Sequence, residues 1–403
     1  MNEKQIKNFI NNINYQDIYD VISFACNYKN SLTTDDKEKI IKRFSEVSNM
    51  YILEDILNDV DWLTKENIDF IINSFIKKDI WDSKIYSYLI EHCPKLSNDN
   101  IKSLISTYIR TFDFTGLHLY EFYKGTRNLS KENICFLVDE VSNIKDVSVI
   151  YNFYDLATDL SKENKMKLIK AIIKINNKGY MYQVATMVSN YNDKDYINLL
   201  VQGMLKSNDS FYIYKFLKLD NLSLENTDNL INKLVTLKDG KYIYKTAMNC
   251  KNLSPSNIDL LVKGIINSND SLYIYKFLTK VKNLNTNYYI ALTDKLFELK
   301  DFDVMKMMID DYLNGSYHKK IGADFEKRIL NTKDLLIITY YLIKTNNKNL
   351  IKLFFETTEK FLVFVLINKE LLDKDEELIC KLAKDINFKD ADFNMKEYVK
   401  SKN

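Results

Sequence analysis

Tyrosines recur at one position relative to a series of regularly spaced leucines, and these tyrosines are the first candidates for a binding role. Five stand nine residues before the following leucine and two are shifted by one residue: Tyr120, Tyr151, Tyr182, Tyr244 and Tyr275, then Tyr86 and Tyr214. A buried tyrosine ring can pack against its neighbours and keep its hydroxyl wet or hydrogen-bonded. The column therefore predicts either a structural ladder between repeats or an aromatic stripe that faces a ligand.

A lysine directly follows the tyrosine in three consecutive units. The earlier units carry Ser87, Glu121, Asn152 and Gln183 at this position, so the lysines belong to one half of the chain. Alternating tyrosine and lysine can stack bases and meet phosphates, as in proteins that bind single strands. The alternative is a solvated helix face. The candidate binding residues are Tyr214, Lys215, Tyr244, Lys245, Tyr275 and Lys276.

Two other groups of reactive side chains predict no site. His92 and Cys93 are adjacent, but a metal site needs three or four converging ligands, and a nucleophilic pair needs adjacency in space. Four acidic residues cluster without the glycine and ligand order of a calcium loop, which favours a solvated acidic face. These are Glu54, Asp55, Asp59 and Asp61. We therefore predict no metal ligand and no catalytic residue.

The short motifs of common enzymes and cofactor sites are missing from the sequence. It contains no G-x-G-x-x-G, no Walker-type lysine loop, no H-E-x-x-H and no G-x-S-x-G. We predict a protein that is not an enzyme and takes no cofactor. A repeat-fold enzyme acting on nucleic acid is the alternative, since such enzymes carry no short signature.

The tyrosines lie in repeated units, and each unit begins at a recurrent helix start that is best seen in residues 252–258. Ser254 stands at the N-cap, where its hydroxyl can accept a hydrogen bond from a free amide of the first turn. Pro255 suits the first helical position. Leu253 and Ile258 have the spacing of a hydrophobic staple. Asn252 suits the left-handed residue that ends a preceding helix.

This helix start recurs along most of the chain at steps of 31 or 33 residues. The leucines are Leu32, Leu63, Leu96, Leu129, Leu160, Leu222, Leu253 and Leu284, with Tyr191 in the one remaining copy. A serine or threonine follows seven of them, and the staple partner is an isoleucine at 68, 101, 134 and 258. Lys165 and Thr227 replace that isoleucine in two units. This spacing indicates structural repeats.

Each unit has the pattern of two amphipathic helices joined by a short turn. In the unit of Leu253, apolar residues from Ile258 to Ile266 recur at helical spacing, residues 267–270 form a turn, and Ile274 to Val281 form a second apolar face before Asn283. One such pair cannot bury both faces alone, so neighbouring units must stack.

Composition narrows the classes of function. Lys+Arg is 57 and Asp+Glu is 55 in 403 residues, a balance that disfavours nucleic-acid binding by overall charge but permits a local basic stripe. Five scattered cysteines without a C-x-x-C pair indicate reduced thiols, and the start lacks a secretory apolar segment, so we expect a cytoplasmic protein. The apolar runs 335–342 and 361–367 are far shorter than the ~20 residues that span a membrane, so no membrane contact is expected.

The capped two-helix units resemble the α-solenoid class that includes HEAT-like and tetratricopeptide-like repeats. The resemblance covers about residues 32–313 and depends on the period and the helix pairing, since the tetratricopeptide Trp-Leu-Gly-Tyr pattern is absent. It implies a protein that binds other macromolecules.

We therefore predict an all-α protein, a right-handed superhelical α-solenoid of about eight to nine two-helix repeats with helical caps. The predicted divisions are an N-terminal cap at 1–31, the repeats at 32–315, and a C-terminal cap or small helical domain at 316–403. The predicted function is a scaffold that binds a protein partner on its second helices, as an adaptor or an inhibitor. The alternative is a nucleic-acid-binding repeat protein that uses the six tyrosines and lysines.

Overall fold

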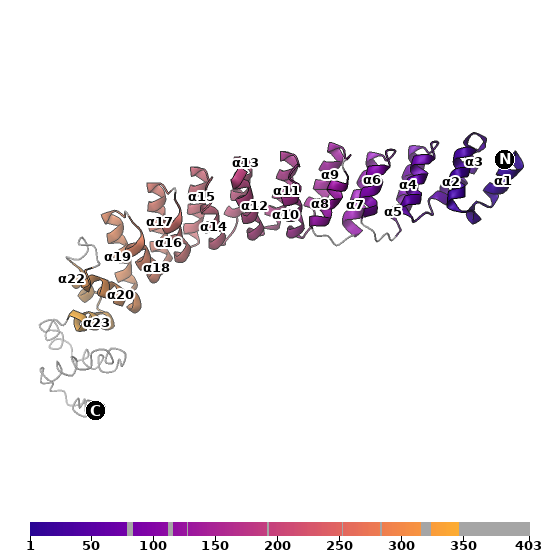
Figure 1. Cartoon of the computed structure of the whole chain (residues 1–403). Coiled ribbons are helices and arrows are strands. Elements are labelled where there is room, and N and C mark those ends of the chain that lie inside the picture. The colour runs from indigo at the N-terminus through magenta and orange to yellow at the C-terminus, as the bar shows by residue number, and fades with distance from the viewer. Residues whose placement is uncertain are drawn as a thin grey trace, which may run out of the picture. The chain divides into compact units, whose positions relative to one another are not determined.

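The computed structural model confirms the all-α fold (Figure 1). It describes residues 1–78, 84–111, 116–126, 128–191, 193–251, 253–282, 284–315 and 324–345, and these contain helices and no strand. The predicted C-terminal cap lies largely outside the described residues, including the apolar run 361–367, as do Asn252 and Asn283. The chain divides into two compact units, Met1–Ser207 and Asn208–Asn403, and the predicted divisions at 31 and 315 stay predictions.

In the first unit, two helices and two short 3-10 helices precede five helical pairs and one further first helix. The elements are α1 (Glu3–Asn11), η1 (Ile13–Tyr15), α2 (Ile18–Asn27), η2 (Lys29–Ser31), α3 (Thr34–Phe44), α4 (Met50–Asp59), α5 (Lys65–Ile76), α6 (Lys84–His92), α7 (Asn98–Thr111), α8 (Gly116–Gly125), α9 (Lys131–Ser142), α10 (Val147–Leu156), α11 (Lys162–Ile175), α12 (Lys178–Tyr191) and α13 (Lys194–Leu205). First helices pack on first helices, as in α7 on α9 and α9 on α11, and second helices on second helices, as in α8 on α10.

The second unit continues the same pattern. Its helices are α14 (Ser210–Leu217), α15 (Leu224–Thr236), α16 (Gly240–Asn249), α17 (Pro255–Ser268), α18 (Ser271–Lys280), α19 (Thr286–Leu299), α20 (Phe302–Leu313), α22 (Phe325–Asn331) and α23 (Leu335–Thr345). The first helices α15, α17 and α19 pack in series, and so do the second helices α14, α16, α18 and α20. The predicted two-helix repeat is confirmed by this arrangement.

The predicted N-caps open the first helices. Ser254 Oγ accepts a hydrogen bond of 3.2 Å from the Asn257 amide, and Pro255 is the first helical residue. The same bond recurs at Thr33, Thr64, Ser97, Ser130, Ser161 and Ser223. Left-handed residues lie at the ends of first helices, as Asn176 and Asn269 do after α11 and α17, and Gly315 follows the second helix α20 with a φ of 68°.

Loss of one such cap should have a measurable cost. We expect Ser254→Ala to lower the free energy of unfolding by about 1 kcal/mol, because the Asn257 amide loses its acceptor. Urea denaturation followed by circular dichroism measures this difference. Ser254→Asp keeps an acceptor at the N-cap and should retain most of the stability, and an equal loss in both variants would contradict a capping role.

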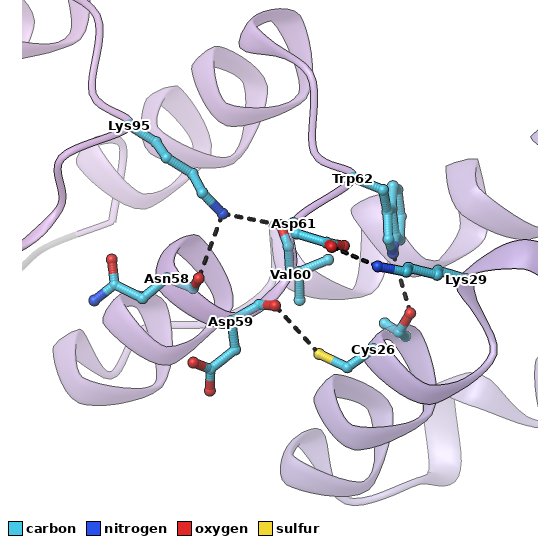
Figure 2. A network of polar contacts seen from close by, with 9 residues as sticks. Cys26, Lys29, Asn58, Asp59, Val60, Asp61, Trp62 and Lys95 are labelled. Carbon is cyan, nitrogen blue, oxygen red and sulfur yellow. Dashed lines mark hydrogen bonds and ion pairs between the residues drawn. The ribbon is translucent and has the colours of Figure 1, made fainter.

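Lysines from one repeat cap the end of a helix in the preceding repeat (Figure 2). Lys95 Nζ lies 3.4 Å from the carbonyl oxygen of Asn58 and 3.2 Å from that of Val60, at the C-terminal end of α4. Carbonyls at a helix end have no intrahelical donor and carry partial negative charge. Lys78 caps the end of α3 in the same way, and partial burial lowers its pKa.

Three further polar contacts link the C-terminal end of α2 to that of α4 (Figure 2). Lys29 forms an ion pair with Asp61, and Trp62 Nε1 donates to the Ala25 carbonyl at 3.1 Å. Cys26 Sγ lies 3.5 Å from the Asp59 carbonyl oxygen, and burial raises its pKa. Asp61 of the acidic cluster therefore has a structural partner, and the hydrogen bond from Lys29 lowers its pKa.

Candidate binding surface on the second helices

A Tyr-Ile-Tyr-Lys sequence occupies three consecutive second helices, at 212–215 in α14, 242–245 in α16 and 273–276 in α18. The central isoleucines Ile213, Ile243 and Ile274 are fully buried. Helical geometry turns each residue by about 100°, so the flanking tyrosines lie at the two edges of the buried face. The candidate binding residues include only the second tyrosine of each motif, although the repeated four-residue sequence also marks the first.

The tyrosine rings join successive repeats into a ladder. The centroids of Tyr214 and Tyr242 are 5.8 Å apart, and those of Tyr244 and Tyr273 are 6.0 Å apart. Tyr151 makes the equivalent contact with Tyr180, at 5.1 Å, in the first unit. These ring contacts thus have the form of a structural ladder between repeats, the first of the two alternatives for the tyrosine column.

Hydroxyl contacts reinforce the ladder. Asn249 Nδ2 donates to Tyr214 Oη at 3.1 Å, and Tyr275 Oη donates to Asp311 of α20. Burial raises the pKa of Tyr275, as do the hydrogen bond to Asp311 and its charge. Tyr214 is only 9% exposed. These tyrosines therefore hold the second helices in register.

The lysine of each motif lies over an aromatic ring on its own helix. Lys215 Nζ is 5.4 Å from the ring centroid of Phe211. Lys245 is 5.4 Å from that of Tyr242, and Lys276 is 4.8 Å from that of Tyr273. All three lysines are half-exposed. These distances permit cation–π attraction, which orients each ammonium along the helix face.

The pattern extends to α20, which lacks the four-residue motif. Lys306 Nζ is 5.4 Å from the ring centroid of Phe302 and 5.5 Å from that of Tyr340 in α23. We call Lys215, Lys245, Lys276 and Lys306 the lysine column. The sequence did not reveal Lys306, because no tyrosine precedes it and its second ring comes from another helix.

Three of the four helices that carry the lysine column are basic. Helices α14, α16 and α18 contain no aspartate or glutamate, and they also carry Lys241 and Lys280. The nearby carboxylates of Asp209, Asp239 and Asp270 cap these helices and accept hydrogen bonds from their backbone amides. The positive charge of α14, α16 and α18 is therefore not balanced on those helices themselves, whereas α20 carries Asp303, Asp310 and Asp311 beside Lys306.

His92 and Cys93, the adjacent pair in the sequence, have structural surroundings. The His92 ring packs against Tyr88, with centroids 4.2 Å apart, and Cys93 is buried. Burial and the charge of Glu54 raise the pKa of the Cys93 thiol to about 12, so it is protonated at neutral pH and a poor nucleophile. Within the described residues no group of three or more His, Cys, Asp or Glu side chains is placed to hold a metal ion.

Comparison with known proteins adds no assignment. No protein-family model matches the chain, and no curated protein matches it. A solved structure described as "Computational Design of Self-Assembling Cyclic Protein Homooligomers" is 14% identical over 77% of this chain and 99% of its own, with a TM-score of 0.08. Such a score carries no argument about fold or function. No helix in the described part of the chain is long and apolar enough to cross a membrane.

Proposed function

We propose that the chain is a non-enzymatic scaffold that binds an acidic protein partner on the second helices α14, α16, α18 and α20. The lysine column is the observation that supports this most directly. Helices that pack side by side are about 8–10 Å apart, so we expect lysines at the same place on successive second helices to recur at about that spacing. A partner segment with several carboxylates can meet successive lysines without any change in the backbone of the scaffold.

Single-stranded nucleic acid is the second candidate, because the lysines can also meet phosphates and Phe211, Tyr242 and Tyr273 lie beside them. Sequence-tolerant binding of single strands depends on rings that are free to stack with bases. Here Tyr242 contacts Phe211 and Tyr214, and a lysine lies over its face. The rings are therefore already engaged, which favours a partner that needs only the charges.

The proposal predicts binding of an acidic polypeptide that depends on the lysine column. We expect an oligoglutamate peptide to bind the full chain at low salt, and Lys245→Glu with Lys276→Glu to weaken that binding about tenfold, because each reversal replaces an attraction with a repulsion. Fluorescence anisotropy of labelled peptide measures the affinity.

The control has the same change in net charge at a different place. Lys170→Glu with Lys174→Glu alters two exposed lysines on α11 and should leave the affinity nearly unchanged. Equal weakening in both double variants would show attraction by overall charge and contradict the proposal. Tighter binding of oligo-deoxythymidine than of oligoglutamate would contradict a protein partner and favour single-stranded nucleic acid as the ligand.

A further inference from the structure

Several second helices carry an exposed apolar residue at the same position. It is the second residue after the N-cap in Tyr51 of α4, Phe211 of α14 and Leu272 of α18. Leu117 of α8 precedes Tyr120 by three residues, as Phe211 precedes Tyr214, and so lies at the same place. The four side chains are between 38% and 60% exposed. Their recurrence at one position distinguishes them from apolar residues scattered singly over a surface.

A charged residue follows each of these apolar residues by four positions, and its sign differs between the two units. Residues four apart on a helix lie on the same face. The charge is a carboxylate in the first unit and an ammonium in the second. We call the first set the acidic face: Tyr51 and Asp55 on α4, with Leu117 and Glu121 on α8. We call the second set the basic face: Phe211 and Lys215 on α14, with Leu272 and Lys276 on α18.

The two faces also have the same interval between their helices. The second helix α6 lies between α4 and α8 and packs on both, and α16 does the same between α14 and α18. Each face therefore spans two packing steps, about 16–20 Å at about 8–10 Å a step. Because spacing and apolar positions match while the charges are opposite, the two faces are complementary.

The carboxylates of the acidic face have no cation among the described residues of their own chain. The ion pairs described in the first unit engage other carboxylates, and none includes Asp55 or Glu121. Burial and the charges of Asp59 and Glu54 raise the pKa of Asp55. An ammonium group brought by another molecule would offset this repulsion.

We propose that the acidic partner is a second copy of the chain, whose acidic face binds the basic face. This inference rests on the proposed function, because Lys215 and Lys276 of the basic face belong to the lysine column. The acidic face sets apolar side chains beside its carboxylates, and these meet Phe211 and Leu272. Each copy carries both faces, so the contact joins unlike surfaces and can recur from copy to copy.

Exchange of charges between the faces tests this contact. The first variant is Asp55→Lys with Glu121→Lys, and the second is Lys215→Glu with Lys276→Glu. We expect the full-length parent to self-associate in sedimentation velocity at low salt, and each variant alone to associate at least tenfold more weakly, because like charges then meet.

An equimolar mixture of the two variants should associate again. The altered faces of the two variants have opposite charges, and so do their unaltered faces. Recovery in the mixture also shows that both variants fold. A mixture that stays monomeric, or a parent that does not self-associate, would overturn the proposal.

A control variant has the same change in net charge on other helices. Glu38→Lys with Glu140→Lys alters an exposed and a half-exposed residue on the first helices α3 and α9. It should self-associate as the parent does. A tenfold loss in this control would show a response to overall charge and contradict the paired faces.

The apolar part of the contact has its own test. Leu117→Ala with Leu272→Ala keeps every charge and should weaken self-association about tenfold, because each face loses apolar area that the contact buries. Unchanged association would contradict contact through these faces.

The two proposals can fail separately. Oligoglutamate binding by a chain that sediments as a monomer at every concentration would retain the proposed function and overturn self-association. Absence of oligoglutamate binding would contradict the proposed function, and the mixture of charge-exchanged variants would still test the paired faces.

Discussion

Replacement of Gly116 by alanine should destabilise the first unit by about 2–3 kcal/mol. A Cβ atom at this position would lie 2.3 Å from Asn152 Cβ and 2.7 Å from both the Phe153 amide nitrogen and the Val149 carbonyl oxygen. Two of these atoms are backbone, which cannot rotate away as a side chain can. Helices α8 and α10 would have to separate, and overpacking of this kind typically costs 1–3 kcal/mol.

The loss should appear in urea denaturation and in faster hydrogen exchange of the α8 and α10 amides. Gly125→Ala is the matched control, because the same helix ends there and the nearest atoms, 3.3 and 3.4 Å away, belong to the side chain of Ser87. We expect that variant to stay within about 0.5 kcal/mol of the parent. Similar stabilities for the two variants would contradict the close approach of α8 and α10.

The free energy of unfolding should fall steeply above pH 10. Burial raises the pKa of Tyr108 and Tyr154 above the usual value, with smaller contributions from Glu121 and Tyr196. The unfolded chain releases these phenolic protons near pH 10, while the folded chain keeps them. The folded state thus binds more protons, and each tyrosine costs about 1.4 kcal/mol of stability per pH unit as the pH rises toward its folded pKa.

Urea denaturation at pH 9, 10 and 11 measures this slope. Tyr108→Phe with Tyr154→Phe removes both ionisable groups and should flatten the alkaline slope. Tyr108 Oη donates to the His118 carbonyl at 3.1 Å, so the double variant should also lose about 1 kcal/mol at pH 8. An unchanged slope in the double variant would show that other groups control alkaline unfolding.

Local chemistry made the helix starts predictable from the sequence. Ser254 and Asn257 are three residues apart, and the hydrogen bond between them depends on little else. The same reasoning applies to Asp209, Asp239 and Asp270, which cap the second helices and were not identified as caps, although their signal is equally local. The serine and threonine caps of the first helices recur at a nearly fixed period, and that period was enough to predict the repeat.

The roles of the aromatic residues required the tertiary structure. The sequence shows a tyrosine column but leaves open whether its rings face a ligand or a neighbouring repeat. Tyr214 meets Tyr242 only because α14 and α16 pack side by side, and Lys306 meets Tyr340 only because α20 and α23 do. The binding role of the lysine column remains for the charge-reversal experiment to test.

The sequence by itself determined the helix starts, the period and the all-α class, because capping bonds and apolar faces form within one helix. Only the tertiary structure decided which rings form the ladder and where Gly116 lets two backbones approach. These features depend on distances between side chains a whole repeat apart in the chain. Such distances follow from the packing of every residue between the helices, and no short motif records them.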